Sequence, residues 1–219
     1  MKASIILPAY NEGKNIGSVI RAVKKSGDHE IIVVDDGSRD NTLDVARADG
    51  CVCVRLNKNM GKGYACKTGA KIATNNNLVF IDSDGQLDAK QIPSLLATLK
   101  SCDIAVGVRN MDDIPIQRKF SNKFARSIVS AAAGKKLGDV LCGFRAIRKK
   151  DLFNLQLKKG RYEFEAEMII KAVRKGMTIK EVPVSVRYGI GSSMPITESA
   201  KVTSYVMGAA LQGFYSHKM

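Results

Sequence analysis

An α/β fold with a mostly parallel sheet is predicted by two features of the sequence. Over the first 108 residues, apolar segments typical of buried strands alternate five times with helical segments. This pattern favours a parallel sheet with helices on both faces. Polar turns rich in glycine and aspartate follow the strands that end near residues 7, 34, 81 and 108. Because ligands of open α/β sheets bind outside the carboxyl ends of the strands, we expect a ligand site at that edge.

The first half of the chain supplies the elements of this alternation. Its apolar segments predict strands at residues 3–7, 31–34, 51–56, 78–81 and 104–108. Helices are expected at residues 15–25, 42–48, 64–74 and 88–100. The first of these helices has its apolar residues on one face, namely Ile16, Val19, Ile20 and Val23. Ser38 or Asp40 is expected to cap the second helix at its start near Thr42.

From residue 109 onward the pattern is less regular. Helices are expected at residues 118–133, 151–155 and 163–175, a glycine-punctuated loop or strand at 138–145 and a half-buried strand at 179–188. We expect one domain over residues 1–195, with halves at 1–108 and 109–195, followed by a tail at 196–219. The tail has a weakly amphipathic helical pattern with little positive charge on its polar face. It is therefore expected to pack on the body rather than lie in a membrane interface.

The positive charge of the chain is concentrated in its second half. The net charge is +14, of which residues 1–99 contribute +2 and residues 100–187 contribute +11. Such a distribution indicates a polyanionic partner, which includes nucleic acid, an anionic membrane surface or a phosphorylated substrate, although a solvated basic surface is the plainer alternative. A nucleic-acid-binding module is disfavoured, because base stacking needs aromatic side chains and these make up only 6% of the chain, with no tryptophan.

Several classes of protein are disfavoured by missing motifs. Neither the dinucleotide fingerprint nor the Walker A sequence follows the first strand, which argues against a dehydrogenase and a P-loop NTPase. The five cysteines form no C-x-x-C pair, so reduced thiols are expected rather than a zinc site or disulfides. The chain opens with no signal peptide, and no apolar run reaches the roughly 18 residues that span a bilayer. We therefore expect a cytoplasmic protein.

A candidate metal site follows the strand at residues 78–81. Asp82 and Asp84 stand two residues apart, so both carboxylates point the same way on an extended chain. With Gln86 they offer the oxygen ligands that a hard divalent cation prefers, and such a cation keeps room for substrate phosphates. An ordinary turn rich in Asp and Gly is the alternative interpretation.

At this point the motifs resemble a known family. In chain order they are Leu7-Pro8-Ala9-Tyr10-Asn11-Glu12, Val33-Val34-Asp35-Asp36-Gly37-Ser38, Asn59-Met60-Gly61-Lys62-Gly63, Asp82-Ser83-Asp84-Gly85-Gln86, Val106-Gly107-Val108-Arg109, Asp139-Val140-Leu141-Cys142-Gly143-Phe144-Arg145, Tyr162-Glu163-Phe164-Glu165-Ala166-Glu167 and Glu181-Val182-Pro183. Together they resemble the family 2 inverting glycosyltransferases of the GT-A fold, and within them the dolichyl-phosphate mannose synthase and polyprenyl-phosphate glycosyltransferase group. The resemblance implies a Rossmann-like, mostly parallel mixed sheet flanked by helices.

The resemblance also implies roles for individual residues. Asp82, Asp84 and Gln86 would bind Mg²⁺ or Mn²⁺, which neutralises the diphosphate leaving group. Asp84 and Arg109 would be the catalytic residues, and Arg109 and Arg187 would contact phosphate or sugar oxygens. The nucleotide sugar would be held by Pro8, Tyr10, Glu12, Val34, Asp35, Asp36, Lys62, Asp82, Ser83, Asp84, Arg109 and Arg187. Which of Asp35 and Asp36 contacts the base stays open.

The acceptor implied by the resemblance is a lipid phosphate. Such a phosphate is already anionic at pH 7, so it needs cations rather than a strong base. Candidates for this binding are Arg118, Lys119, Lys123, Arg126 and Arg145. If the acceptor were a hydroxyl, Glu163, Glu165 or Glu167 would be the candidate bases, although acidic residues also favour a helix N-terminus.

We therefore expect transfer of mannose or glucose, from GDP-mannose or UDP-glucose, to dolichyl or polyprenyl phosphate with inversion. A family 2 enzyme acting on a glycan or other hydroxyl is the alternative. Many members of the group carry transmembrane helices after the catalytic domain, whereas this sequence ends at residue 219. A peripheral enzyme at the cytoplasmic face, attached through its basic surface, is expected, and a soluble acceptor stays open. An inactive scaffold is disfavoured by the intact Asp82, Asp84 and Arg109.

Overall fold

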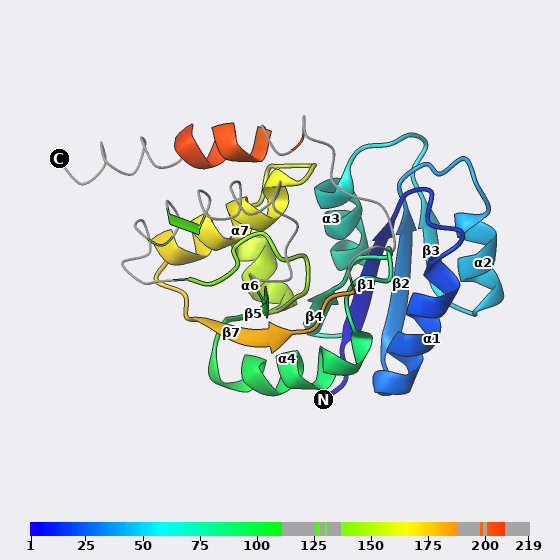
Figure 1. Ribbon diagram of the computed structural model, residues 1–219, viewed down its shortest axis with the longest axis horizontal. Coiled ribbons are helices and arrows are strands. Elements are labelled where there is room, and N and C mark those ends of the chain that lie inside the picture. Colours follow the sequence, from blue (N-terminus) through cyan, green and yellow to red (C-terminus); the bar gives the residue numbers. More distant parts are fainter. Residues whose placement is uncertain (111–125, 128–129, 131–136, 188–197, 199–200, 209–219) are drawn as a thin grey trace.

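A single seven-stranded sheet forms the centre of the molecule (Figure 1). The computed structural model describes residues 1–110, 126–127, 130, 137–187, 198 and 201–208 of the chain. The strand order in the sheet is β3-β2-β1-β4-β6-β5-β7. The strands are β1 (Ser4–Ala9), β2 (Glu30–Asp35), β3 (Val52–Arg55), β4 (Asn77–Phe80), β5 (Ile104–Arg109), β6 (Arg145–Arg148) and β7 (Ile179–Val184).

Strand β6 is the antiparallel member of this sheet. It pairs antiparallel with β4 and with β5, whereas the pairs among the other strands are parallel. The mixed, mostly parallel sheet is thus confirmed, and the carboxyl ends of β1, β2, β4 and β5 lie on one edge. Of the loop or strand predicted at residues 138–145, the loop is observed up to Phe144, and β6 begins at Arg145.

Helices cover both faces of the sheet, as predicted. They are α1 (Ile16–Ser26), α2 (Thr42–Ala48), α3 (Lys62–Ile72), α4 (Ile92–Thr98), α6 (Lys149–Asn154) and α7 (Glu163–Arg174), and 3₁₀ turns at Ala89–Gln91 and Leu99–Ser101 flank α4. Alternate strand residues enter two separate cores, because successive side chains of a strand point to opposite faces. Ile6 and Leu78 join the core under α3 and α7, whereas Ile5 and Val79 join the core under α1 and α4.

Helix α7 is anchored on the sheet by an aromatic pair. The Phe164 ring meets the Phe80 ring edge to face, with 5.7 Å between their centroids. The helical stretch 201–208 packs on the same core through the buried Val202 and Val206. Within the described residues, this bears out the expectation that the tail packs on the body. The helix expected at 118–133 lies outside the described residues apart from 126, 127 and 130.

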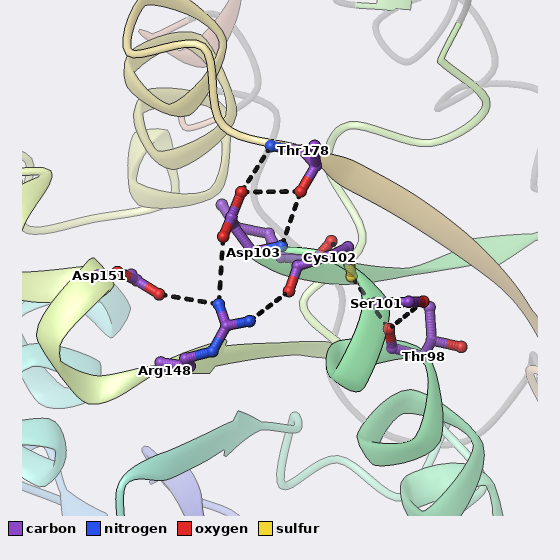
Figure 2. A network of polar contacts seen from close by, with 8 residues as sticks. Thr98, Ser101, Cys102, Asp103, Arg148, Asp151 and Thr178 are labelled. Atoms are coloured by element: carbon purple, nitrogen blue, oxygen red, sulfur yellow. Dashed lines mark hydrogen bonds and ion pairs between the residues drawn. The ribbon is translucent and has the colours of Figure 1, made fainter.

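A network of polar contacts ties together β5, β6 and β7 at the edge of the sheet opposite the predicted site (Figure 2). The Arg148 guanidinium donates to the carboxylates of Asp103 and Asp151 and to the carbonyl of Cys102. Asp103 in turn accepts hydrogen bonds from the backbone N–H and the hydroxyl of Thr178. These contacts set the alignment of the three strands, and they occupy the Arg148 guanidinium with partners within the protein. Among the residues that the structure describes, we find no helix with the length and apolar character needed to span a bilayer.

Candidate active site

The turns after β1, β2 and β4 are joined to one another by hydrogen bonds. The Ser83 hydroxyl donates to the Pro8 carbonyl at 2.7 Å, which fastens the turn after β4 to the end of β1. The backbone N–H of Asn11 donates to the Ser38 hydroxyl at 2.9 Å, and that of Glu12 to the Thr42 hydroxyl at 2.8 Å. The expected gathering of these turns on one edge is confirmed, and Tyr10 is exposed there.

The two aspartates after β2 are engaged by the protein itself. Asp35 is fully buried and accepts a hydrogen bond from the Ser38 N–H at 2.9 Å. Asp36 accepts from the N–H groups of Met60 and Gly61 at 2.7 and 2.8 Å, and burial, which outweighs these bonds, raises its pKa. In this structure both carboxylates hold turns of the site, and their contact with a nucleotide stays a prediction.

Val34 does not present its side chain to a ligand. The side chain is fully buried in the core under α3. It lies so close to Gly69 of that helix that a Cβ at Gly69 would be 3.2 Å from Val34 Cγ2. The expectation that Val34 binds the nucleotide sugar is therefore wrong for its side chain. Its place in the core instead fixes the two aspartates that follow it.

The candidate metal ligands lie in a turn at the end of β4. Asp84 accepts a hydrogen bond from the Gln86 N–H at 2.9 Å, so the turn is closed by its own carboxylate. Burial, followed by the neighbouring Asp82 carboxylate, raises the pKa of Asp84 to about 6. The Arg187 N–H donates to the Gln86 carbonyl at 2.8 Å, which brings the chain after β7 to this turn. The contact of the Arg187 side chain with phosphate or sugar oxygens stays a prediction.

Lys62, the first residue of α3, bridges two carboxylates. Its ammonium lies 2.5 Å from Asp82 Oδ1 and 2.7 Å from Glu165 Oε1. Burial by itself would lower the pKa of Lys62, but the Asp82 and Glu165 carboxylates raise it well above its usual value. Lys62 thus remains charged and links the turn after β4 to α7.

Gly143 leaves the space that this ion pair occupies. A Cβ built on Gly143 would lie 2.7 Å from both Lys62 Nζ and Asp82 Oδ2, closer than real side chains approach. Gly61 and Gly63 serve a similar purpose, but the backbone that approaches them is that of Gly160 and Arg161, with the Phe164 side chain beside it. These two glycines thus allow the backbone before α7 and the start of α7 to approach α3 closely.

The residues present fit a divalent cation that is completed by ligand oxygens. Asp82, Asp84 and Gln86 supply only oxygen donors, the type that Mg²⁺ and Mn²⁺ prefer. Within the described ranges, no group of three or more His, Cys, Asp or Glu side chains could enclose a metal ion by itself. Mg²⁺ is usually bound by one or two carboxylates together with substrate phosphates, and the site offers that arrangement.

Arg145 is part of the structure and is not positioned to bind an acceptor. It is 1% exposed, and its guanidinium donates to the carbonyls of Val140, Cys142 and Glu165 at 2.6 to 2.7 Å. The expectation that it binds the acceptor phosphate is therefore wrong, because three backbone acceptors already surround it. It instead holds the loop that carries Gly143 next to the start of α7.

Arg109 also faces a carboxylate of the protein. Its Nε and Nη2 donate to the two oxygens of the buried Asp139 at 2.5 and 3.1 Å. Arg109 was expected to bind a phosphate with two parallel hydrogen bonds. In this structure it makes these two bonds to Asp139, which lies in the loop before Gly143. The catalytic role of Arg109 stays a prediction.

The other acceptor candidates are placed only in part. Arg126 is half-buried in a helical stretch, whereas Arg118, Lys119 and Lys123 lie outside the described residues. Of the candidate bases, Glu167 is buried and accepts from the N–H groups of Lys158 and Lys159, and Glu165 is paired with Lys62. Glu163 is only partly buried, so it is the base candidate among the three that is not enclosed.

Two residues of the site had no such role in the sequence analysis. Glu165 was considered only as a base, and Gly143 was part of a motif without a function. The sequence features that could have indicated this contact are Lys62, which stands between two glycines at the start of one helix, and the acidic residues at the start of the helix near residue 163. The distance between these residues along the chain does not indicate that α3 and α7 meet, so the contact between the two helices was found only in the structure.

Comparison with known proteins identifies the family. Residues 4–154 match the model of "Glycosyl transferase family 2". Two relatives come from Methanocaldococcus jannaschii. "Uncharacterized protein MJ1222" is 33% identical over 84% of this chain and 81% of its own length, and "Uncharacterized protein MJ0544" is 35% identical over 84% and 87%.

Solved structures share the fold. Glucosyl-3-phosphoglycerate synthase from Mycobacterium tuberculosis, in complex with Mn²⁺, uridine diphosphate and glucosyl-3-phosphoglycerate, matches with a TM-score of 0.79 and 24% identity over 97% of this chain and 79% of that chain. Its complex with Mn²⁺ and uridine-diphosphate-glucose matches with a TM-score of 0.77 and 25% identity over 97% and 78%. With the family model covering most of the sheet and the site, this chain belongs to glycosyl transferase family 2 and has the GT-A fold.

Proposed function

We propose that this protein transfers a hexose from a nucleotide-diphosphate sugar to a polyprenyl phosphate, with inversion and with the help of Mg²⁺ or Mn²⁺. The observation that carries the proposal is the pair of carboxylates at the end of β4, of which Asp82 is paired with Lys62 beside Gly143, in a chain of this family. Asp82, Asp84 and Gln86 would hold the cation, which supplies charge neutralisation for the departing diphosphate.

The donor half of the proposal is supported by the similar structures. They are described as complexes with uridine-diphosphate-glucose and with Mn²⁺ or Mg²⁺. In the present chain the edge of the sheet that carries Asp82 and Asp84 also carries Tyr10 and Asp36, from the turns after β1 and β2, and Lys62, from the start of α3. UDP-glucose and GDP-mannose are the two donors that we propose to test first.

The acceptor half is supported by chemistry and charge. A phosphomonoester is anionic at pH 7 and attacks without a strong base, and two of the three candidate bases are engaged in the fold. The net charge of +11 in residues 100–187 suits an anionic lipid at a membrane surface. In this proposal the enzyme is peripheral and works at the cytoplasmic face.

Transfer to lipid can be measured directly. The protein is incubated with radiolabelled UDP-glucose or GDP-mannose, Mn²⁺ and polyprenyl phosphate in detergent, and label is counted after organic extraction. We expect extractable label that requires Mn²⁺ and that is lost in the variant Asp84→Asn. Failure to extract label with either donor, from protein that binds a nucleoside diphosphate with Mn²⁺, would count against the lipid acceptor but not against the family.

A second candidate is transfer to the hydroxyl of a small phosphorylated acceptor. It is favoured by the similar structures, which are described as complexes with phosphoglyceric acid and with glucosyl-3-phosphoglycerate. In that case Glu163 is the candidate base that is partly exposed. The same assay separates the two, because a product of this kind keeps its label in the aqueous phase.

A further inference from the structure

We propose that Lys62 and the divalent cation compete for Asp82, and that Glu165 is a positioning residue that receives Lys62 when the cation binds. This inference rests on the proposed function, because it concerns the cation of that function. It goes further in assigning a movable counter-charge to the site and a role to a glutamate that touches neither nucleotide nor cation.

The competition follows from the geometry at Asp82. The Lys62 ammonium lies 2.5 Å from Asp82 Oδ1, at direct ion-pair distance. A divalent cation on the same carboxylate would meet this positive charge at a few ångströms, where repulsion is worth several kcal/mol even at an effective dielectric constant of about 20. Lys62 must therefore leave Asp82, or the cation binds weakly.

The surroundings direct where Lys62 can go. On one side the backbone of Gly143 approaches so closely that a Cβ there would lie 2.7 Å from Lys62 Nζ. On the other side stands Glu165, whose Oε1 already forms an ion pair with the Lys62 ammonium at 2.7 Å. Movement toward Glu165 keeps one ion pair intact while it releases Asp82.

Glu165 has an unused oxygen to receive the ammonium. Glu165 is 4% exposed, and its Oε2 atom is buried without a hydrogen-bond partner among the described residues. A buried oxygen without a partner is costly, and a second bond from the three-donor ammonium would satisfy it. The backbone that carries this carboxylate is held firmly, because Arg145 donates to the Glu165 backbone carbonyl at 2.6 Å and the adjacent Phe164 packs on Phe80.

The exchange would also prepare the site for its anionic ligand. Once it is shifted from Asp82, Lys62 no longer neutralises a metal ligand and stands beside the cation at the start of α3. There it adds positive charge next to the diphosphate that the cation binds. Cation binding and the position of Lys62 are thus coupled, without any change in the backbone.

The test is a titration with Mn²⁺ alone, in which free Mn²⁺ is measured by its electron paramagnetic resonance signal. We expect Lys62→Met to bind Mn²⁺ about tenfold more tightly than the wild type, and Glu165→Gln to bind it about tenfold more weakly, since typical coupling between sites is of this size. Glu167→Gln is the matched control. It removes another buried glutamate of α7 that does not contact Lys62, and it should leave Mn²⁺ affinity unchanged.

The double variant decides whether Glu165 acts through Lys62. Lys62→Met with Glu165→Gln removes both buried charges together, so it does not leave Glu165 as an unpaired buried charge, as Lys62→Met alone does. We expect it to bind Mn²⁺ as tightly as Lys62→Met, because Glu165 has no lysine left to position. Affinity as weak as that of Glu165→Gln, or a Lys62→Met variant no tighter than the wild type, would overturn the inference.

The outcome is separable from failure of the proposed function. If wild-type protein binds Mn²⁺ in the presence of UDP or GDP but the variants do not differ as stated, the function stands and the competition is refuted. If no variant binds Mn²⁺, with or without nucleoside diphosphate, both are refuted.

Discussion

The turns at the carboxyl ends of β1, β2 and β4 and the segment 137–187 use their charged residues in different ways. At the end of β4, Asp82 and Asp84 remain partly exposed, and one lysine is shared between a site carboxylate and α7. In the second region the arginines are engaged by the protein. Arg145 binds three carbonyls and Arg148 binds two aspartates, while Asp139 of this region holds Arg109 of β5 through two hydrogen bonds.

This difference shows what net charge does and does not predict. Residues 100–187 hold 20 Lys and Arg against 9 Asp and Glu, which suggested a set of cations for a phosphate acceptor. Buried guanidinium groups with several fixed acceptors stabilise loops and strand alignment, however, and are not available to a ligand. Charge therefore predicts an anionic partner more safely than it predicts which cation touches it.

Replacing Arg145 is the strongest way to test the structural role of the second region. Arg145→Met removes the guanidinium donor from three buried carbonyls, so we expect a loss of roughly 3 kcal/mol in the free energy of unfolding. Urea denaturation measures it, with the exposed Lys150→Met as a control that should change stability by less than about 0.5 kcal/mol. A stable Arg145→Met protein with a raised KM for acceptor would instead restore the phosphate-binding role.

Replacing Asp84 tests the ligand-binding region. We expect Mn²⁺ with UDP or GDP to stabilise the wild type by about 2.7 kcal/mol at 100 times the dissociation constant. In Asp84→Asn the part of this stabilisation that depends on Mn²⁺ should vanish. Thermal denaturation with and without Mn²⁺ measures it, and Asp88→Asn, which caps a 3₁₀ turn through Lys90, should keep the full effect. An unchanged shift in Asp84→Asn would remove Asp84 from the metal site.

Gly143→Ala tests whether the close approach of Gly143 to Lys62 and Asp82 matters for the stability of the fold or for binding of the cation. The atoms that its Cβ would meet are the ends of two flexible side chains, Lys62 and Asp82. They can move aside, so we expect a stability loss below about 1 kcal/mol but a loss of Mn²⁺ affinity of about tenfold. Gly208→Ala is the control, because a Cβ there meets nothing within 4 Å. Equal Mn²⁺ affinity in both variants would show that the close approach at Gly143 does not matter.

The smallest effect is expected at the opposite edge of the sheet, at His29. Both of its ring nitrogens are buried and lack a hydrogen-bond partner among the described residues, in the wall of a pocket of about 400 Å³. Burial is the largest cause that lowers the pKa of His29 below its usual 6.5. The unfolded chain therefore takes up the proton first as pH falls, and stability drops from about pH 6.5 downward.

Since the ring is only partly buried and solvent screens its charge, we expect a contribution of about 0.5 kcal/mol. Denaturation at pH 5 and pH 7 should show a smaller difference for His29→Gln than for the wild type. The Mn²⁺-dependent stabilisation should be the same in both, since His29 is remote from the turn after β4. An identical pH dependence of stability in both proteins would refute the claim that burial of His29 lowers its pKa and destabilises the fold at low pH.

Much of the fold was predictable because it depends on local patterns. The alternation of buried strands and amphipathic helices gave the parallel sheet with two covered faces, and the helix at 42–48 was predicted with its observed bounds. Of the loop or strand expected at 138–145, the loop is observed up to Phe144, and β6 (Arg145–Arg148) extends beyond the expected segment. Its antiparallel position between β4 and β5 depends on pairing with strands far along the chain, which no local pattern encodes.

The sequence by itself determined the class of fold, the edge of the sheet where the site forms and the turn that carries Asp82 and Asp84. These follow from the period of the apolar residues and from the rule that parallel strands end on one edge. Only the tertiary structure decided that Lys62 lies between Asp82 and Glu165, that Gly143 makes room for them and that Arg145 is a buried clamp. The physical reason is that an ion pair or a hydrogen bond between distant segments depends on distances of a few ångströms, which charge and spacing along the chain do not contain.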